Sequence, residues 1–313
     1  MQNQDLKAIL DTIQENWSIN PEAEITLEAN PDDLNEKVLK LWQETGINRL
    51  SIGIQSLYDD ELKWMNRAHN ATEALSAIEK AKKAGFNQLT VDFIYGSEWM
   101  TDERWAKTLE WISKQQIPHI SCYALTVEPK TPLAKKKRSI LKVEEENEKQ
   151  GRQFMMLMEA MNGAGYEHYE ISNFALPGQR SRHNSGYWKG EYYLGIGPSA
   201  HSYNGVSRQW NIANNTKYIQ EISNEIIPAE IETLSKTQKI NEYILTNLRL
   251  KEGCDKERMT EHFGVEYLAQ MEKNIKKYED KGWIEVSAER FMLTDAGRLF
   301  ADAIAADLFF SED

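Results

Sequence analysis

The pattern of apolar and polar positions repeats a strand-like run after a helix-like run over the first 125 residues. Residues 46–53 (GINRLSIG) match residues 85–92 (GFNQLTVD) position by position in character, and residues 117–123 form a weaker third copy. Between the first two copies, residues 71–84 carry apolar side chains at helical spacing behind Asn70, a suitable helix cap. Strands that alternate with helices in this way predict βα units and a parallel sheet, and the period fits an open sheet as well as a barrel.

An earlier strand is predicted over residues 24–30, where apolar and polar side chains alternate. Pro31 ends this strand, because proline lacks an N–H and forces the residue before it into an extended conformation. Asp33 and Glu36 then have the spacing of a capping box, which predicts the start of a helix. Glu28 is therefore expected at the carboxyl end of a strand beside a helix N-terminus, which is where parallel α/β folds bind ligands.

The pattern is less regular on either side of these units. Residues 1–17 have the spacing of an amphipathic helix, residues 144–162 predict another, and residues 166–174 alternate like one more strand. Residues 180–210 are rich in Gly, Ser, Tyr, His and Asn and show little periodicity. Because long irregular segments of compact proteins are usually functional, residues 176–233 are interpreted as an irregular connecting segment with a functional role.

Residues 234–313 change character and predict a separate module. Three helical patterns, the second over residues 254–263, are followed by a hairpin pattern over residues 283–293 and by a last helix that starts at Thr294. This is the order of elements in a winged helix. Because the segment holds more Asp and Glu than Lys and Arg, a packing or interaction module is favoured over DNA binding.

The charge and the cysteines limit the classes of partner. A formal net charge of −12 over 313 residues argues against binding of bulk nucleic acid or of an anionic membrane. Cys122 and Cys254 are the only cysteines and form no metal or disulfide motif, so a reducing compartment is expected. No apolar run reaches the roughly 20 residues of a membrane span. The composition predicts a soluble cytoplasmic protein without an integral membrane segment and leaves peripheral membrane contact open.

Four motifs follow one another in an order that is typical of one family. They are residues 24–31 (EITLEANP), 48–56 (NRLSIGIQS), 65–69 (MNRAH) and 91–96 (VDFIYG). In this order they resemble the radical S-adenosylmethionine family of oxygen-independent coproporphyrinogen III oxidases. Residues 183–188 (HNSGYW) resemble the H-N-x-x-Y-W signature of the HemW branch of that family, the haem chaperones.

The resemblance implies an α/β fold in two parts. Residues 1–175 are expected to form a partial (β/α) barrel of the radical S-adenosylmethionine type, and residues 234–313 a winged-helix-like α+β module. The family carries a [4Fe-4S] cluster on a C-x-x-x-C-x-x-C loop, and neither this motif nor the Gly-Gly-Gly-Thr-Pro loop after it occurs in the printed chain. The barrel is expected to lack its first two units, in a truncated reading frame or in a clusterless relative. No radical S-adenosylmethionine catalysis is expected from the chain as given.

The resemblance also implies contacts with S-adenosylmethionine. The family positions for this cofactor correspond to Glu28, Gln55, Arg67, Asp92 and Ala124. A carboxylate accepts hydrogen bonds from amino or hydroxyl groups, and an arginine pairs with a carboxylate, so these residue types suit the cofactor. Two alternatives stay open, because Glu28 also suits a helix cap and Arg67 a surface ion pair. Without the cluster, binding of this cofactor is expected to be weak or lost.

For haem, the imidazole of His183 is the natural ligand of the iron, and Tyr187 and Trp188 suit an apolar wall against the porphyrin. The alternative is that His183 and Asn184 only bond backbone groups of an irregular loop. His201 is a second candidate ligand, less favoured because small residues surround it in the sequence.

Two functions follow from the resemblance. The first is a HemW-like haem chaperone, which binds haem and transfers it to a target protein that the sequence does not identify. The alternative is an oxygen-independent coproporphyrinogen III oxidase of porphyrin biosynthesis. The H-N-x-x-Y-W match favours the chaperone.

Overall fold

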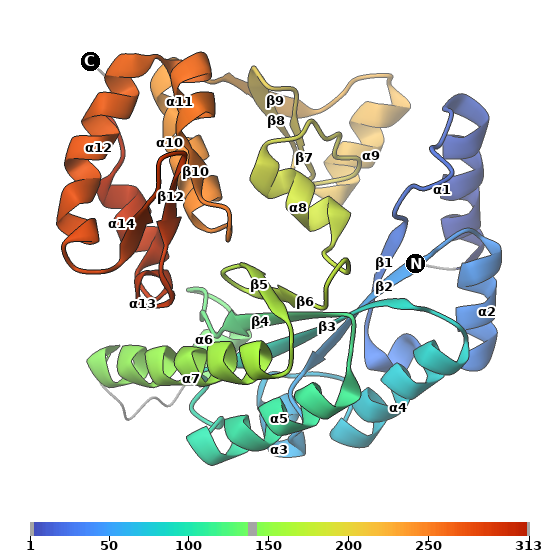
Figure 1. The fold of residues 1–313 in the computed structure, drawn as a ribbon. Helices are drawn as coiled ribbons and strands as arrows, with labels where there is room; N and C mark the ends of the chain where they lie inside the picture. The colour runs from blue at the N-terminus through green and yellow to red at the C-terminus, as the bar shows by residue number, and fades with distance from the viewer. Residues whose placement is uncertain (1–2, 137–142, 312–313) are drawn as a thin grey trace. The chain divides into compact units, whose positions relative to one another are not determined.

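The structure, a computed structural model, describes residues 3–136 and 143–311. The chain forms two compact units, Met1–Arg180 and Ser181–Asp313 (Figure 1). The first unit contains one large sheet with helices, and the second contains two small sheets with helices. No helix in the described ranges has the length and apolarity needed to cross a membrane.

The first unit is built on a six-stranded sheet in the order β1-β2-β3-β4-β6-β5. Its first four strands are parallel, namely β1 (Thr26–Ala29), β2 (Arg49–Gln55), β3 (Gln88–Tyr95) and β4 (His119–Ala124). Arg49 pairs with Gln88 and Ile52 pairs with Val91, so the two repeated sequence runs are neighbouring strands. This pairing confirms the predicted parallel βα units.

Helices precede, separate and follow these strands along the chain. They are α1 (Asn3–Asn16), α2 (Glu36–Glu44), α3 (Asp59–Trp64), α4 (Ala71–Lys83), α5 (Asp102–Gln115), α6 (Pro132–Lys136) and α7 (Val143–Gly163). Asn70 caps α4 in a capping box with Glu73, as the sequence predicts for this cap. Figure 1 shows α4 and α5 on the same side of the sheet.

The two faces of the sheet differ in polarity because successive strand residues point to opposite sides. On β2, Leu50, Ile52 and Ile54 are fully buried in the apolar core. They alternate with Ser51 and Gly53, which are only half-buried. The polar face carries Ser51 and, on β3, Asp92, and this is the face that matters for the candidate site.

Two local predictions in the first unit are wrong. Asp33 does not cap α2; Pro31–Asp33 is a short 3-10 helix, and the side chain of Asn35 accepts the capping hydrogen bond from Val38 N. Residues 166–174 are not one strand but part of a hairpin of β5 (Glu167–Glu170) and β6 (Asn173–Ala175). Alternation continues through both strands, so periodicity alone does not reveal the turn between them.

The second unit begins with regular elements where an irregular segment was predicted. These are α8 (Arg182–Lys189), α9 (Asn215–Ser223) and an antiparallel sheet of β7 (His201–Tyr203), β8 (Ser207–Asn211) and β9 (Ala229–Thr233). The prediction of irregular structure over residues 176–233 is therefore wrong for these parts. The helix α8 has only eight residues, mostly polar, and the strands are mostly half-exposed, so neither produces a clear apolar period.

The rest of this unit has the predicted winged-helix order. Its helices are α10 (Lys236–Leu248), α11 (Lys256–Phe263), α12 (Val265–Glu279), α13 (Asp295–Arg298) and α14 (Ala301–Asp307). The hairpin of β11 (Ile284–Val286) and β12 (Arg290–Leu293) is antiparallel, and β10 (Cys254–Asp255) joins its other side. The second helix was predicted to start at Cys254; it starts after Asp255, whose side chain accepts the capping bond from Arg258 N.

Candidate functional site

The strands of the first unit bring Glu28 and Asp92 to the same face of the sheet. Glu28 pairs with Ser51 across β1 and β2, and the Ser51 hydroxyl donates a 3.3 Å hydrogen bond to Asp92 Oδ2. Burial raises the pKa of Asp92 from 3.8 to about 6, hydrogen bonds from Ser121 and Ser51 act in the opposite sense, and the charge of Glu28 raises it further. The two carboxylates therefore share one electrostatic environment.

Arg67 and Gln55 meet above Gly53 at the end of β2. The guanidinium Nη2 of Arg67 donates to Asn30 Oδ1 at 2.6 Å and to the carbonyl oxygen of Gly53 at 3.1 Å. A Cβ on Gly53 would lie 2.9 Å from Gln55 Nε2 and 3.2 Å from Arg67 Nη2, so a larger residue here would displace the ends of these two side chains. Gln55 itself has a φ of 66°, a left-handed conformation that is uncommon for residues other than glycine.

Ala124 lies on a different face from these four residues. It pairs with Tyr95 at the end of β4, and its methyl group packs on the apolar core. It can contact a ligand at the strand ends through its backbone. The other four residues form two groups, Glu28 with Asp92 and Gln55 with Arg67. The first group supplies carboxylate oxygens, and the second supplies an amide and a guanidinium.

The two alternatives for these residues can be compared with the contacts. The side chain that caps α2 is that of Asn35, not Glu28. Arg67 bonds an amide oxygen and a backbone carbonyl oxygen, rather than forming the carboxylate pair of a surface ion pair. These contacts leave the carboxylate of Glu28, which is exposed on β1, accessible to a ligand.

We predict that Asp92 makes the stability of the protein depend on pH. Its folded pKa of about 6 lies above the ordinary 3.8, so its contribution to folding is greatest below pH 3.8 and is lost as the pH rises through about 6. The shift corresponds to roughly 2–3 kcal/mol at neutral pH, since one unit is about 1.4 kcal/mol. Asp92→Asn should remove this decrease in stability with rising pH. Urea unfolding between pH 4 and pH 7 would measure the free energy of unfolding of both proteins. Asp33→Asn, at an exposed carboxylate, is the control, and an equal pH slope in Asp92→Asn and the wild type would contradict the prediction.

The cysteines do not fit the ligand set of a [4Fe-4S] cluster. Cys122 on β4 and Cys254 on β10 are both free and buried, and they belong to different units. Burial raises the pKa of both thiols, which opposes the thiolate form that iron requires. Within residues 3–136 and 143–311, no group of three or more His, Cys, Asp or Glu side chains is arranged to hold a metal ion.

The motif at residues 183–188 forms most of α8 in the second unit. Ser181 caps this helix by accepting a hydrogen bond from Asn184 N. The Asn184 Oδ1 atom accepts a 3.2 Å hydrogen bond from the indole nitrogen of Trp188 one turn later, which fixes the orientation of the indole. His183 and Tyr187 are also one turn apart, and their rings meet edge to face with centroids 4.8 Å apart. The spacing of the motif is therefore explained by the helix, which pairs its side chains at positions i and i+4.

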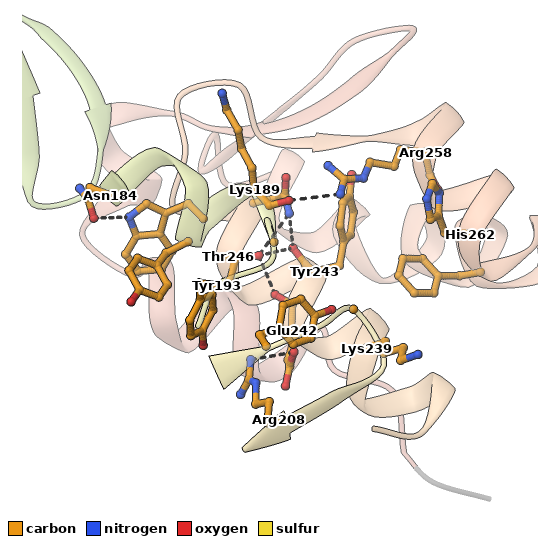
Figure 2. Close-up of a pocket in the computed structure, with 17 residues that line it drawn as sticks. Asn184, Lys189, Tyr193, Arg208, Lys239, Glu242, Tyr243, Thr246, Arg258 and His262 are labelled. Carbon is orange, nitrogen blue, oxygen red and sulfur yellow. Dashed lines mark hydrogen bonds and ion pairs between the residues drawn. The ribbon is translucent and has the colours of Figure 1, made fainter. Parts of the chain in front are cut away.

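Beside this helix lies a cavity of about 660 Å³ within the second unit (Figure 2). This volume is in the ordinary range of small-molecule and cofactor sites, about 300–1,000 Å³. Its walls are strongly aromatic and include Tyr187, Trp188, Tyr193, Tyr203, Tyr243 and Phe263. Of the residues that the sequence proposes for haem, Tyr187 and Trp188 line the cavity, whereas His183 contacts it through Tyr187. His201 lies on β7 beside Trp210, with ring centroids 6.4 Å apart, and is not a lining residue.

Sequence reasoning missed the opposite walls of this cavity. Arg208 comes from β8, Glu242 from α10, and Arg258 and His262 from α11. These residues are up to 54 positions apart in the sequence (208 to 262) and belong to no local motif. The sequence contains one indication of this cavity, the Tyr-Trp pair of α8. That pair indicates one wall of the cavity and not the others.

Comparisons with known proteins agree with this architecture. The profile of the radical SAM superfamily matches residues 2–112, and that of the HemN C-terminal domain matches residues 234–300. The solved structure of coproporphyrinogen III oxidase (HemN) from Escherichia coli has a TM-score of 0.84 over 99% of this chain and 75% of its own, at 20% sequence identity. At that identity the likeness establishes the fold. It confirms a mixed α/β architecture of the radical S-adenosylmethionine type with a HemN-like C-terminal part.

Curated relatives resemble the chain over most of its length. The haem chaperone HemW of Bacillus subtilis is 31% identical over 97% of this chain and 81% of its own. That of Lactococcus lactis is 32% identical over 94% of this chain and 77% of its own. Identity at this level and coverage, together with the α8 motif, shows that the chain belongs to the HemW family within the radical S-adenosylmethionine superfamily.

Proposed function

We propose that this protein is a haem chaperone, which binds haem and releases it to an acceptor protein. The observation that carries the proposal is the position of α8: the H-N-x-x-Y-W sequence forms a helix whose Tyr187 and Trp188 line an aromatic cavity of about 660 Å³. A porphyrin is a flat apolar ring, and aromatic walls bury such a ring with favourable stacking. The named function of the curated relatives, haem chaperone, supports the same conclusion.

His183 is the proposed iron ligand on the α8 side of the cavity. It lies on the same face of the helix as Tyr187, four residues earlier, and its side chain is exposed. Histidine is the common protein ligand of haem iron, and the neutral ring offers a nitrogen lone pair for it. When bound, haem supplies an iron centre and a strong absorption band that reports its ligands.

The strand-end residues of the first unit are proposed to hold S-adenosylmethionine only weakly. Glu28, Gln55, Arg67 and Asp92 offer polar contacts, with Ala124 contributing its backbone. These residues cannot replace a cluster that would chelate the cofactor, and the two buried cysteines do not fit such a cluster. For the same reason we do not propose the oxidase activity for the chain as printed.

Two measurements test the chaperone function. Titration of the 313-residue protein with ferric haem should give a saturable Soret band at a one-to-one ratio. Mixing the loaded protein with apomyoglobin, as a generic acceptor, should move the haem to the acceptor and change the spectrum accordingly. Absence of saturable binding would refute the haem function, and binding without any transfer would refute the chaperone step.

A further inference from the structure

The cavity of the second unit is positively charged, although the whole chain has a net charge of −12. Its lining includes the cations Lys189, Arg208, Lys239 and Arg258, against the single carboxylate of Glu242 among the described lining residues. Glu242 Oε2 lies 2.8 Å from Arg208 Nη2, and burial raises the pKa of Glu242. This local excess of cations indicates a ligand that carries more than one negative charge.

Arg208 has an unused donor inside this wall. Its Nε atom is buried and has no hydrogen-bond partner among the described residues, although Nη2 of the same side chain holds Glu242. A buried N–H without a partner is unfavourable, so Arg208 is a strained member of this wall whose side chain gains a hydrogen bond if it turns toward a ligand. The guanidinium fork suits a carboxylate, which accepts hydrogen bonds from two nitrogens together.

His262 is placed like a metal ligand on the other side of the cavity. Its Nδ1 atom is 3.1 Å from the carbonyl oxygen of Arg258, one turn earlier in α11. A carbonyl only accepts, so Nδ1 carries the proton and Nε2 of the neutral ring keeps its lone pair. Metal-binding histidines are commonly held through the other ring nitrogen in this way. Figure 2 shows His262 on one side of the cavity and Asn184 of α8 on the other.

Building on the proposed haem function, we infer that this cavity holds the porphyrin and that His262 ligates its iron from the wall opposite α8. Arg208, Lys239 and Arg258 bind the carboxylates of the porphyrin. The aromatic residues between these groups contact the ring. His183, which contacts the lining residue Tyr187, would supply the second imidazole to the iron from the α8 side.

The iron arm of the test compares two neighbouring exposed residues of α11. His262→Ala should convert ferric haem from the low-spin spectrum of two imidazoles to a high-spin spectrum with a shifted Soret band. It should weaken haem binding about tenfold, while binding of metal-free protoporphyrin IX stays unchanged. Glu261→Ala is the matched control, since Glu261 is exposed on the same helix and does not line the cavity. Circular dichroism melts verify that both variants fold.

The carboxylate arm uses a ligand that lacks the negative charges. Arg208→Gln should weaken the binding of haem and of protoporphyrin IX by about tenfold. The wild type should bind iron protoporphyrin dimethyl ester about tenfold more weakly than it binds haem. Arg208→Gln should have no further effect on the ester. Lys217→Gln removes an exposed cation on α9 that is not a lining residue and should change nothing.

The outcomes separate this inference from the proposed function. A wild-type protein that binds no haem refutes the chaperone function itself. Haem binding that retains its low-spin spectrum in His262→Ala overturns the ligand assignment. Haem binding with equal affinity for the dimethyl ester overturns the carboxylate site. In the last two cases the chaperone function stands, and the iron ligand or the carboxylate contacts assigned to this cavity are wrong.

Discussion

Replacing His183 by alanine is expected to shift the Soret band of bound haem and to weaken binding at least tenfold. The loss of an imidazole ligand would change the ligand field of the iron and remove one metal bond, and tenfold corresponds to about 1.4 kcal/mol. Residual binding should remain, because the aromatic walls still bury the porphyrin at about 25 cal/mol per Å² of apolar surface. Absorption titration measures both the band position and the affinity.

Two other histidines provide the controls for His183→Ala. His69 and His119 are buried in the first unit, where His69 Nε2 lies 3.1 Å from Ile54 O and His119 Nε2 lies 2.8 Å from the Tyr169 hydroxyl. His69→Ala and His119→Ala should leave the haem spectrum unchanged, provided that each variant folds. If the spectrum of His183→Ala is also unchanged, the ligand moves to His201 on β7, or the motif has no role in ligating iron.

Gly253→Ala is expected to lower the free energy of unfolding by about 2–5 kcal/mol. Gly253 has a φ of 68°, which costs an L-residue about 1–2 kcal/mol. A Cβ at this position would lie 2.0 Å from the carbonyl oxygen of Phe291 on β12. That atom belongs to a paired backbone, so relief requires movement of the strand, at a further cost of about 1–3 kcal/mol. Urea unfolding measures the difference.

Gly282→Ala separates the two contributions to that prediction. Gly282 has a φ of 69° and no heavy atom within 4 Å of its hypothetical Cβ. Gly282→Ala therefore has only the cost of the left-handed backbone conformation. Its expected cost is therefore about 1–2 kcal/mol. Equal destabilisation by Gly253→Ala and Gly282→Ala would show that the close approach to Phe291 does not matter.

The sequence was most informative where local rules and tertiary packing agree. The βα repeat predicted a parallel sheet, and the structure pairs the two repeated runs as parallel strands, with Arg49 of β2 opposite Gln88 of β3. The cap at Asn70 was also predicted, because a capping box depends only on residues one turn apart. At α2, by contrast, Asp33 and Asn35 both suit a cap, and the 3-10 helix that places Asn35 is not visible from residue type.

The candidate site was only partly predictable, for two physical reasons. The βα pattern predicted Glu28 near a strand end, whereas Asp92 was assigned through the family resemblance and lies within β3. The cavity in the second unit is assembled from α8, β8, α10 and α11, and no periodicity relates these elements. Arg208 and His262 have no signature in the sequence, because their roles depend on the walls that they face.

The two buried cysteines give the protein a built-in means of measuring the opening of each unit separately. Cys122 is on β4 in the first unit and Cys254 on β10 in the second, and both thiols are at most 1% exposed. A thiol reagent therefore modifies each one only after local or global opening, and the labelling rate under native conditions reports the free energy of that opening. Peptide mapping assigns the rates to the two sites. Haem that binds in the second unit should slow modification of Cys254 and leave that of Cys122 unchanged, without any introduced probe.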